Sequence, residues 1–354
     1  MLQGDRWMLY GANGFTGTLV AEEAVKRGHR PILAGRSAEK LRPLAERLGL
    51  EMVAVDLNDA RGLEDAVKRV PLVFHAAGPF VHTSEPMLKA CLAAKASYVD
   101  ITGELSVFER TLSLDARAKQ LGIALISGVG FDVIPSDCLA KYVASAVPEA
   151  TSLEIAFSAV GSPSAGTAKT MLEMMPRGAY VRRNGALVPA PTPAETRVVR
   201  FPKGDRTVIS IPWGDLVTAY HSTGVPNITT YIAMPPAVAR VNQVLDPLIT
   251  RVLEYPSVLR TAQKLVERVA KGPTEAERAT GRSMLWARAS DKRGNAKEAW
   301  LDTVEGYRLT AEGGVLAVEK ILEKGVTGAT TPALAFGADF VLEIGSTRRL
   351  DSLD

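Results

Sequence analysis

The chain has 354 residues, which is enough for two domains of about 150 residues each. Hydrophobic residues make up 46% of it and charged residues 23%, a composition that excludes disordered, collagen-like and disulfide-framework proteins. The 42 Lys and Arg residues are interspersed among 39 Asp and Glu residues, so we expect no nucleic-acid partner, and two cysteines fit a reducing, cytoplasmic compartment.

Short apolar runs alternate with helical stretches along the first 135 residues. Strands are expected at 7–10, 31–35, 52–55, 72–77, 98–101 and 123–126. Helices are expected at 16–27, 37–48 (with Pro43 inside it) and 63–69. Strands that alternate with helices indicate right-handed βαβ units and a parallel sheet. The fold class predicted for 1–135 is therefore α/β, a Rossmann-type parallel-sheet domain.

A glycine-rich turn joins the first strand to the first helix. It reads Gly11-Ala12-Asn13-Gly14-Phe15-Thr16-Gly17. Glycines without Cβ atoms allow a tight turn and a close approach to a pyrophosphate, which the N–H groups at the start of the helix can bind. Because the motif lies between a strand and a helix, we predict dinucleotide binding by Gly11, Asn13, Gly14, Phe15, Thr16 and Gly17.

The ends of the next strands refine this prediction. An NAD site usually has an acidic residue after the second strand, whereas this chain has Gly35-Arg36-Ser37. A guanidinium there can pair with a 2′-phosphate, so we predict NADPH over NADH. Asp56 fits either an adenine contact or a turn. Ala77, Gly78 and Pro79 follow the fourth strand, and we expect this loop to run beside the cofactor.

The pattern changes after residue 135, where we predict a second, mixed α+β domain at 136–330 for substrate binding and dimerisation. Strands are expected at 153–157, 181–188 (a hairpin around Asn184-Gly185), 207–211, 227–232, 284–289 and 299–304. Helices are expected at 310–322 and 333–342. These two helices and the last segment, 331–354, are expected to pack back on the first domain, and we expect a homodimer.

A basic amphipathic stretch covers residues 237–270. Ordinary core packing explains it, and peripheral contact with a membrane remains the alternative. No apolar run approaches the ~20 residues that a transmembrane helix needs, and the first residues do not resemble a signal peptide.

Several motifs together resemble the saccharopine dehydrogenase-like NADP-binding reductases, and especially their branch of bacterial trans-acting enoyl reductases. The motifs lie at 11–17, 34–37, 77–80, 98–104, 130–137, 305–311 and 331–333. The resemblance implies a Rossmann domain joined to an α+β substrate domain, NADP(H) as cofactor, and reduction of a small or acyl-linked substrate.

Catalytic residues are less clearly marked. No tyrosine is followed four residues later by a lysine, which disfavours the short-chain reductase mechanism, and four scattered histidines give no metal cluster. A reductase still needs a group that delivers a proton or stabilises charge. Tyr98 and Asp132 are the candidates, both at expected carboxyl ends of strands; Asp132 fits a helix cap equally well.

Three functions remain open at this point. The first is NADPH-dependent reduction of a C=C or C=N bond next to a carbonyl, with an enoyl-type acyl group as one candidate substrate. The second is an amino-acid dehydrogenase that forms or cleaves a C–N bond, for which Arg177, Arg182 and Arg183 could hold carboxylates. The third is a non-catalytic NADP(H)-binding partner protein.

Overall fold

The computed structural model describes residues 6–158, 163–174, 180–190, 195–239, 251–253 and 255–353. Two compact units divide the chain. The first consists of Met1–Ile134 with Tyr307–Phe336, and the second of Pro135–Gly306 with Gly337–Asp354. Downstream of 306 this differs from the expected boundaries: 307–336 returns to the first unit, whereas 337–354 belongs to the second. The reason is strand pairing, because β15 and β16 join different sheets.

The first unit contains a seven-stranded sheet in the order β15-β6-β5-β4-β1-β2-β3, and every neighbouring pair is parallel. Its strands are β1 (Met8–Tyr10), β2 (Ile32–Gly35), β3 (Met52–Ala54), β4 (Leu72–His75), β5 (Ser97–Asp100), β6 (Ala124–Ile126) and β15 (Gly328–Thr330). Its helices are α1 (Phe15–Lys26), α2 (Ala38–Leu48), α3 (Ala60–Val67), α4 (Phe80–Ala94), α5 (Leu105–Ser113), α6 (Asp115–Leu121), α13 (Gly306–Lys324) and α14 (Pro332–Phe336). The predicted Rossmann-type sheet is confirmed.

Burial explains why these strands read as continuous apolar runs. Every residue of β1, β2 and β4 is buried, as expected where helices cover both faces of a parallel sheet. Local signals set the helix ends: the Ser37 hydroxyl accepts from the Lys40 N–H at the start of α2, and Gly49 ends that helix in the left-handed region. Pro43 lies inside α2 without ending it.

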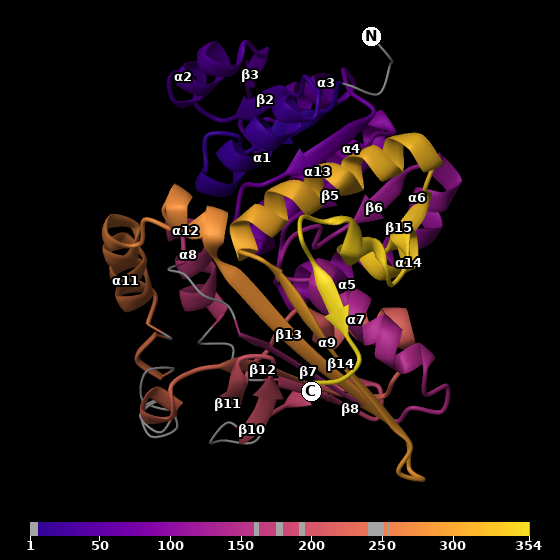
Figure 1. Cartoon of the computed structure of the whole chain (residues 1–354). Coiled ribbons are helices and arrows are strands. Elements are labelled where there is room, and N and C mark those ends of the chain that lie inside the picture. Colours follow the sequence, from indigo (N-terminus) through magenta and orange to yellow (C-terminus); the bar gives the residue numbers. More distant parts are fainter. Residues whose placement is uncertain are drawn as a thin grey trace. The chain divides into compact units, whose positions relative to one another are not determined.

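The second unit is built on a mixed sheet whose main path runs β10-β11-β12-β7-β13-β14-β16. Its strands are β7 (Ser152–Ser158), β8 (Tyr180–Arg183), β9 (Ala186–Pro189), β10 (Thr196–Phe201), β11 (Gly204–Ser210), β12 (Asn227–Ala233), β13 (Arg282–Ser290), β14 (Ala296–Val304) and β16 (Arg348–Leu350). Its helices are α7 (Ile134–Ser145), α8 (Ala165–Met174), α9 (Asp215–Thr223), α11 (Pro256–Val269), α12 (Glu275–Thr280) and the 3-10 helix η2 (Phe340–Glu343). Figure 1 shows the long strands β13 and β14 side by side, and they pair antiparallel.

The hairpin expected around Asn184-Gly185 is confirmed as β8–β9, with positive φ angles of 50° and 80° at the two turn residues. The single helix expected at 333–342 is wrong. Gly337, with a φ of +95°, separates α14 from η2. The sequence reading also missed β10, β15 and β16; the last two have three residues each, too few to show a period.

Candidate functional site

The glycine turn after β1 has no room for side chains at two of its three glycines. Gly11 has a φ of +86°, and a Cβ there would lie 2.8 Å from the backbone of Ala76 and Ala77. A Cβ on Gly17 would lie 2.2 Å from the Gly11 carbonyl oxygen. The first glycine therefore brings the turn against the loop after β4, and the third lets α1 pack on β1. These are two of the glycine roles in a dinucleotide-binding turn.

The start of α1 fits an anion. Gly14 occupies the N-cap position without a side-chain hydrogen bond, and the first turn of the helix carries no acidic residue. A helix N-terminus that no carboxylate neutralises has N–H groups and a positive dipole end available for a pyrophosphate. The Asn13 side chain lies beside Gly35 at the end of β2, since a Cβ on Gly35 would be 3.2 Å from the Asn13 Oδ1.

Arg36 and Ser37 follow β2, as expected. Arg36 is exposed, and Ser37 caps α2. The Tyr10 hydroxyl donates to the Val55 carbonyl (3.0 Å), and burial together with the charge of Asp56 raises the pKa of Tyr10 to about 12, an effect that Arg36 opposes. The charges of Arg36 and Asp56, which follow β2 and β3, thus both act on the Tyr10 hydroxyl.

Asp56 forms a turn. Its Oδ1 accepts from the backbone N–H (2.9 Å) and the side-chain amide (2.8 Å) of Asn58. This arrangement is the turn alternative weighed from the sequence, and it leaves the adenine contact as a prediction.

The loop after β4 runs beside the glycine turn. The Ala76 N–H donates to the Tyr10 carbonyl (2.8 Å), and the Thr83 hydroxyl donates to the Ala77 carbonyl (2.6 Å). Gly78 is exposed. His75 ends β4 inside the core, where burial lowers its pKa to about 3, so we assign it a packing role in its neutral form.

Tyr98 is not at the carboxyl end of its strand, which corrects the expectation from the sequence. It is the second residue of β5, it is fully buried, and its hydroxyl donates to the Asp100 Oδ2 (2.8 Å). Burial raises the pKa of Tyr98 well above its usual value. Side chains alternate along the strand, so Tyr98 lies on the same face as Asp100. A role for Tyr98 as proton donor stays a prediction.

Asp100 occupies the strand end instead and links two loops. Its Oδ1 accepts from the N–H groups of Thr102 and Gly128 (3.0 Å each), and its Oδ2 accepts from the hydroxyls of Tyr98 and Ser127 (2.8 Å each). Burial raises the pKa of Asp100, and these four bonds oppose that rise. The sequence reading did not single out Asp100, although it lies in the 98–104 motif; its role is to hold the loops after β5 and β6.

Asp132 lies in the loop after β6 and meets the loop after β5. A Cβ on Gly103 would be 3.0 Å from the Asp132 Oδ2, so the carboxyl group packs against that backbone. Burial, and then the charge of Glu104, raise the pKa of Asp132 to about 7. A carboxyl group of this kind exchanges a proton near neutral pH.

Glu104 is a second residue that the sequence reading did not assign. It is buried, and its carboxylate accepts from the N–H groups of Phe80 (2.9 Å) and Val81 (2.6 Å) in the first turn of α4. Its charge therefore stabilises the N-terminus of α4, directly after the Gly78-Pro79 loop. The only signal in the sequence was its place in the 98–104 motif.

Two of the arginines proposed for carboxylate binding instead donate hydrogen bonds to groups within the second unit. Arg182 is buried and donates to the carbonyl oxygens of Leu216 and Gly185 (2.5 Å each). Arg183 donates to the Thr229 hydroxyl (3.0 Å) and the Arg182 carbonyl (2.9 Å). Arg177 lies outside the described residues. Arg182 and Arg183 thus hold the hairpin and its neighbours.

The described residues contain no group of three or more His, Cys, Asp or Glu side chains that could hold a metal ion. In the same part of the chain, no helix is long and apolar enough to cross a membrane. Of the amphipathic stretch 237–270, residues 240–250 and 254 lie outside the described part; the remainder includes α11, whose Leu265 and Val269 are exposed.

The parallel sheet, the glycine turn and the bare N-terminus of α1 define a dinucleotide-binding Rossmann domain, joined to a second unit with a mixed sheet. Residues 7–126 match the family model of the saccharopine dehydrogenase NADP binding domain. The first unit therefore carries an NADP-binding domain of the saccharopine dehydrogenase type. This confirms both the resemblance and the expected NADP cofactor.

Curated relatives match a little over a third of the chain. A "Trans-acting enoyl reductase" of Mycobacterium tuberculosis is 36% identical over 138 residues, which are 37% of this chain and 33% of the relative. A "Saccharopine dehydrogenase-like oxidoreductase" of Homo sapiens is 31% identical over 150 residues, 37% of this chain and 35% of the relative. The chain therefore spans about a third of the length of these relatives.

A solved structure extends the likeness in fold. Apo saccharopine dehydrogenase (L-Glu forming) from Saccharomyces cerevisiae superposes with a TM-score of 0.63 at 11% identity, covering 98% of this chain and 100% of that one. At this identity the match concerns the fold alone. It confirms the two-part α/β architecture.

Proposed function

We propose that the chain is an NADPH-dependent reductase of a C=C or C=N bond next to a carbonyl, and that an enoyl-type acyl group is its substrate. The observation that carries this proposal is the position of Asp132. It follows a parallel strand, β6, as the glycine turn follows β1 and the Gly78-Pro79 loop follows β4. The carboxyl ends of parallel strands lie at one edge of a sheet, which is where such folds bind their ligands.

The chemistry divides between cofactor and protein. NADPH, when bound, supplies a hydride to the electrophilic carbon of the double bond. Gly11, Gly14 and Gly17 with the start of α1 hold the pyrophosphate, and Arg36 with Ser37 holds the 2′-phosphate. The protonated Asp132 carboxyl donates its proton to the neighbouring carbon or nitrogen atom and is reprotonated from solvent. Burial, and then the charge of Glu104, keep that proton on Asp132 near neutral pH.

The acyl substrate is favoured by the enoyl reductases among the curated relatives, at 36% identity over 138 residues. The amino-acid dehydrogenase has less support, because its site needs arginines that hold carboxylates, whereas Arg182 and Arg183 donate to groups of the protein itself. The same edge of the sheet would serve either reaction.

The test is NADPH oxidation, followed by its absorbance, with three acceptor classes: an enoyl-thioester, a 2-oxo acid with an amine, and a quinone. Turnover with the thioester supports the proposal, and turnover only with the 2-oxo acid and amine replaces it with the amino-acid dehydrogenase. Tight NADPH binding without turnover on any acceptor identifies a non-catalytic partner protein. Asp132→Asn serves as the catalytic control, since it keeps the side-chain shape but has no acidic proton.

A further inference from the structure

Helix α13 runs beside α1, although about 290 residues separate them in the sequence. At one end, the ring of Tyr307 packs edge-on against the ring of Phe15, with centroids 5.0 Å apart and planes at 81°. At the other end, Glu319 pairs with Arg27 just after α1. Each helix advances twelve residues between the two contacts. The helices are therefore parallel and in register, and both begin at the edge of the sheet where the glycine turn lies.

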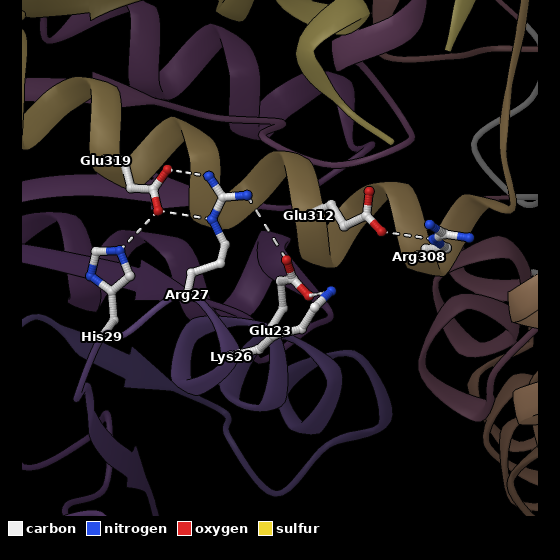
Figure 2. Close-up of polar contacts among 7 residues, drawn as sticks. All are labelled: Glu23, Lys26, Arg27, His29, Arg308, Glu312 and Glu319. Carbon is white, nitrogen blue, oxygen red and sulfur yellow. Dashed lines mark hydrogen bonds and ion pairs between the residues drawn. The ribbon is translucent and has the colours of Figure 1, made fainter. Parts of the chain in front are cut away.

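Figure 2 shows the contact at Glu319, the ion pair with Arg27 that we call the Arg27–Glu319 clasp. The Glu319 carboxylate accepts from the Arg27 Nε (2.8 Å) and Nη2, and it lies 3.0 Å from the His29 Nε2. Arg27 also lies near Glu23 (3.9 Å). These bonds lower the pKa of Glu319 and raise that of Arg27, so both groups stay charged and paired.

The N-terminal half of α13 contacts the core strands on one side of the glycine turn. The Thr310 hydroxyl accepts from the Phe131 N–H (3.0 Å) in the loop after β6. A Cβ on Gly314 would lie 2.7 Å from the Phe74 ring of β4. In the sheet order, β4 and β6 lie on one side of β1, whereas Arg36 follows β2 on the other.

From this placement we propose that Tyr307 is a cofactor-contacting residue that covers the nicotinamide half of NADPH, and that the Arg27–Glu319 clasp is the device that positions it. Phe15, the partner of the Tyr307 ring, is the first residue of the helix whose N-terminus receives the pyrophosphate. The Arg36 guanidinium, after β2, attracts the 2′-phosphate and so places the adenosine half on that side of β1. The nicotinamide half of NADPH then extends toward β4 and lies against the ring of Tyr307. This inference rests on the proposed cofactor site.

The test compares two ligands in titrations of the full chain. NADPH occupies both halves of the site, whereas 2′,5′-ADP occupies only the adenosine half. We expect Tyr307→Ala to weaken NADPH binding about tenfold and to leave 2′,5′-ADP binding within twofold, because an aromatic contact of ~1.5 kcal/mol is lost. Tyr307→Phe, which keeps the ring, should bind both ligands as the natural chain does.

Tyr255→Ala removes an exposed tyrosine of the second unit and serves as the matched control. Equal weakening of both ligands by Tyr307→Ala would overturn the proposal, since the residue would then only support the fold of the domain. Unchanged NADPH binding would also overturn it. A natural chain that binds neither ligand would instead refute the cofactor site itself, so the two failures are distinguishable.

A second experiment tests whether the Arg27–Glu319 clasp positions Tyr307. Glu319→Gln should weaken NADPH binding about threefold in the natural background and have no further effect in Tyr307→Ala, because the clasp acts through the tyrosine. Glu323→Gln changes an exposed glutamate on the same helix and should have no effect in either background. Additive losses from Glu319→Gln and Tyr307→Ala would show that the clasp does not position Tyr307.

Discussion

Arg36 is the residue on which we expect the preference for NADPH over NADH to depend. It is exposed directly after β2, and within the described residues no hydrogen bond or ion pair holds its guanidinium. We expect Arg36→Gln to weaken NADPH binding by about 10- to 150-fold, the value of one charge-assisted hydrogen bond, and to leave NADH binding unchanged. Fluorescence titration with both cofactors measures this, and Lys40→Gln in α2, the helix that follows Arg36, is the control. Equal loss for the two cofactors would contradict the role of Arg36.

The proposed role of Asp132 as proton donor predicts how the reaction rate depends on pH. Burial, and then the charge of Glu104, raise the pKa of this carboxyl group to about 7. In the proposed mechanism it carries the transferred proton below that pH and has lost it above. We expect kcat/KM to fall about tenfold per pH unit above 7, and Asp132→Asn to be about 100-fold slower or worse. A pH profile of kcat/KM for both proteins checks this. A natural enzyme without that decline would exclude Asp132 as the acid.

The same pKa has a consequence for stability. Because the folded value is raised above the usual 3.8, the folded chain binds more protons than the unfolded chain between about pH 4 and 7. The contribution of Asp132 therefore becomes less favourable as the pH rises through that window. Asp132→Asn should remove this part of the pH dependence of unfolding.

At the scale of the elements, the junction of β1 and α1 depends on Gly17. We expect Gly17→Ala to destabilise the chain by several kcal/mol and to abolish NADPH binding, since its Cβ would lie 2.2 Å from the Gly11 carbonyl. Gly28→Ala, just beyond the other end of α1, has open space and should cost only about 1 kcal/mol for its φ of +89°. Denaturant unfolding and cofactor titration compare the two. Similar small losses would mean that the close packing of α1 on β1 is dispensable.

The helix α13 and the strand β15 show how a later segment completes an earlier element. The Ala329 N–H donates to the Asp115 Oδ1 (3.0 Å), and β15 pairs with β6 over three residues. This pairing covers the edge of β6, which would otherwise present unpaired N–H and carbonyl groups. The segment 307–336 is therefore part of the first sheet, although 172 residues of the second unit precede it (135–306).

At the scale of the whole molecule, this return of the chain can be tested by truncation. A chain that ends at Gly306 lacks α13 and β15 and leaves Phe74 and the edge of β6 uncovered, so we expect aggregation and no cofactor binding. A chain that ends at Phe336 loses only the 337–354 segment of the second unit and should still bind NADPH. The soluble yield and a cofactor titration of the two truncated chains test these expectations. Cofactor binding by the shorter chain would contradict the role of α13.

The expected homodimer stays a prediction, which light scattering of the full chain can test.

Much of the first unit could be predicted because its signals are local. The glycine turn, the cap at Ser37 and the apolar runs of β1, β2 and β4 depend on residues close together in the chain. The second unit was harder, since β16 has three residues and no period of its own. The helix break at Gly337 depends on a positive φ that an isolated glycine does not reveal.

What the sequence alone determined is the parallel-sheet domain, its NADP-binding turn and the candidates Arg36 and Asp132, because short-range patterns encode them. Tertiary structure decided that Tyr98 is buried, that Asp100 and Glu104 hold the loops around Asp132, and that Tyr307 lies against Phe15. Contacts between residues as far as about 290 positions apart leave no periodic trace in the chain. Only burial, hydrogen bonds and strand pairing in the folded molecule bring those groups together.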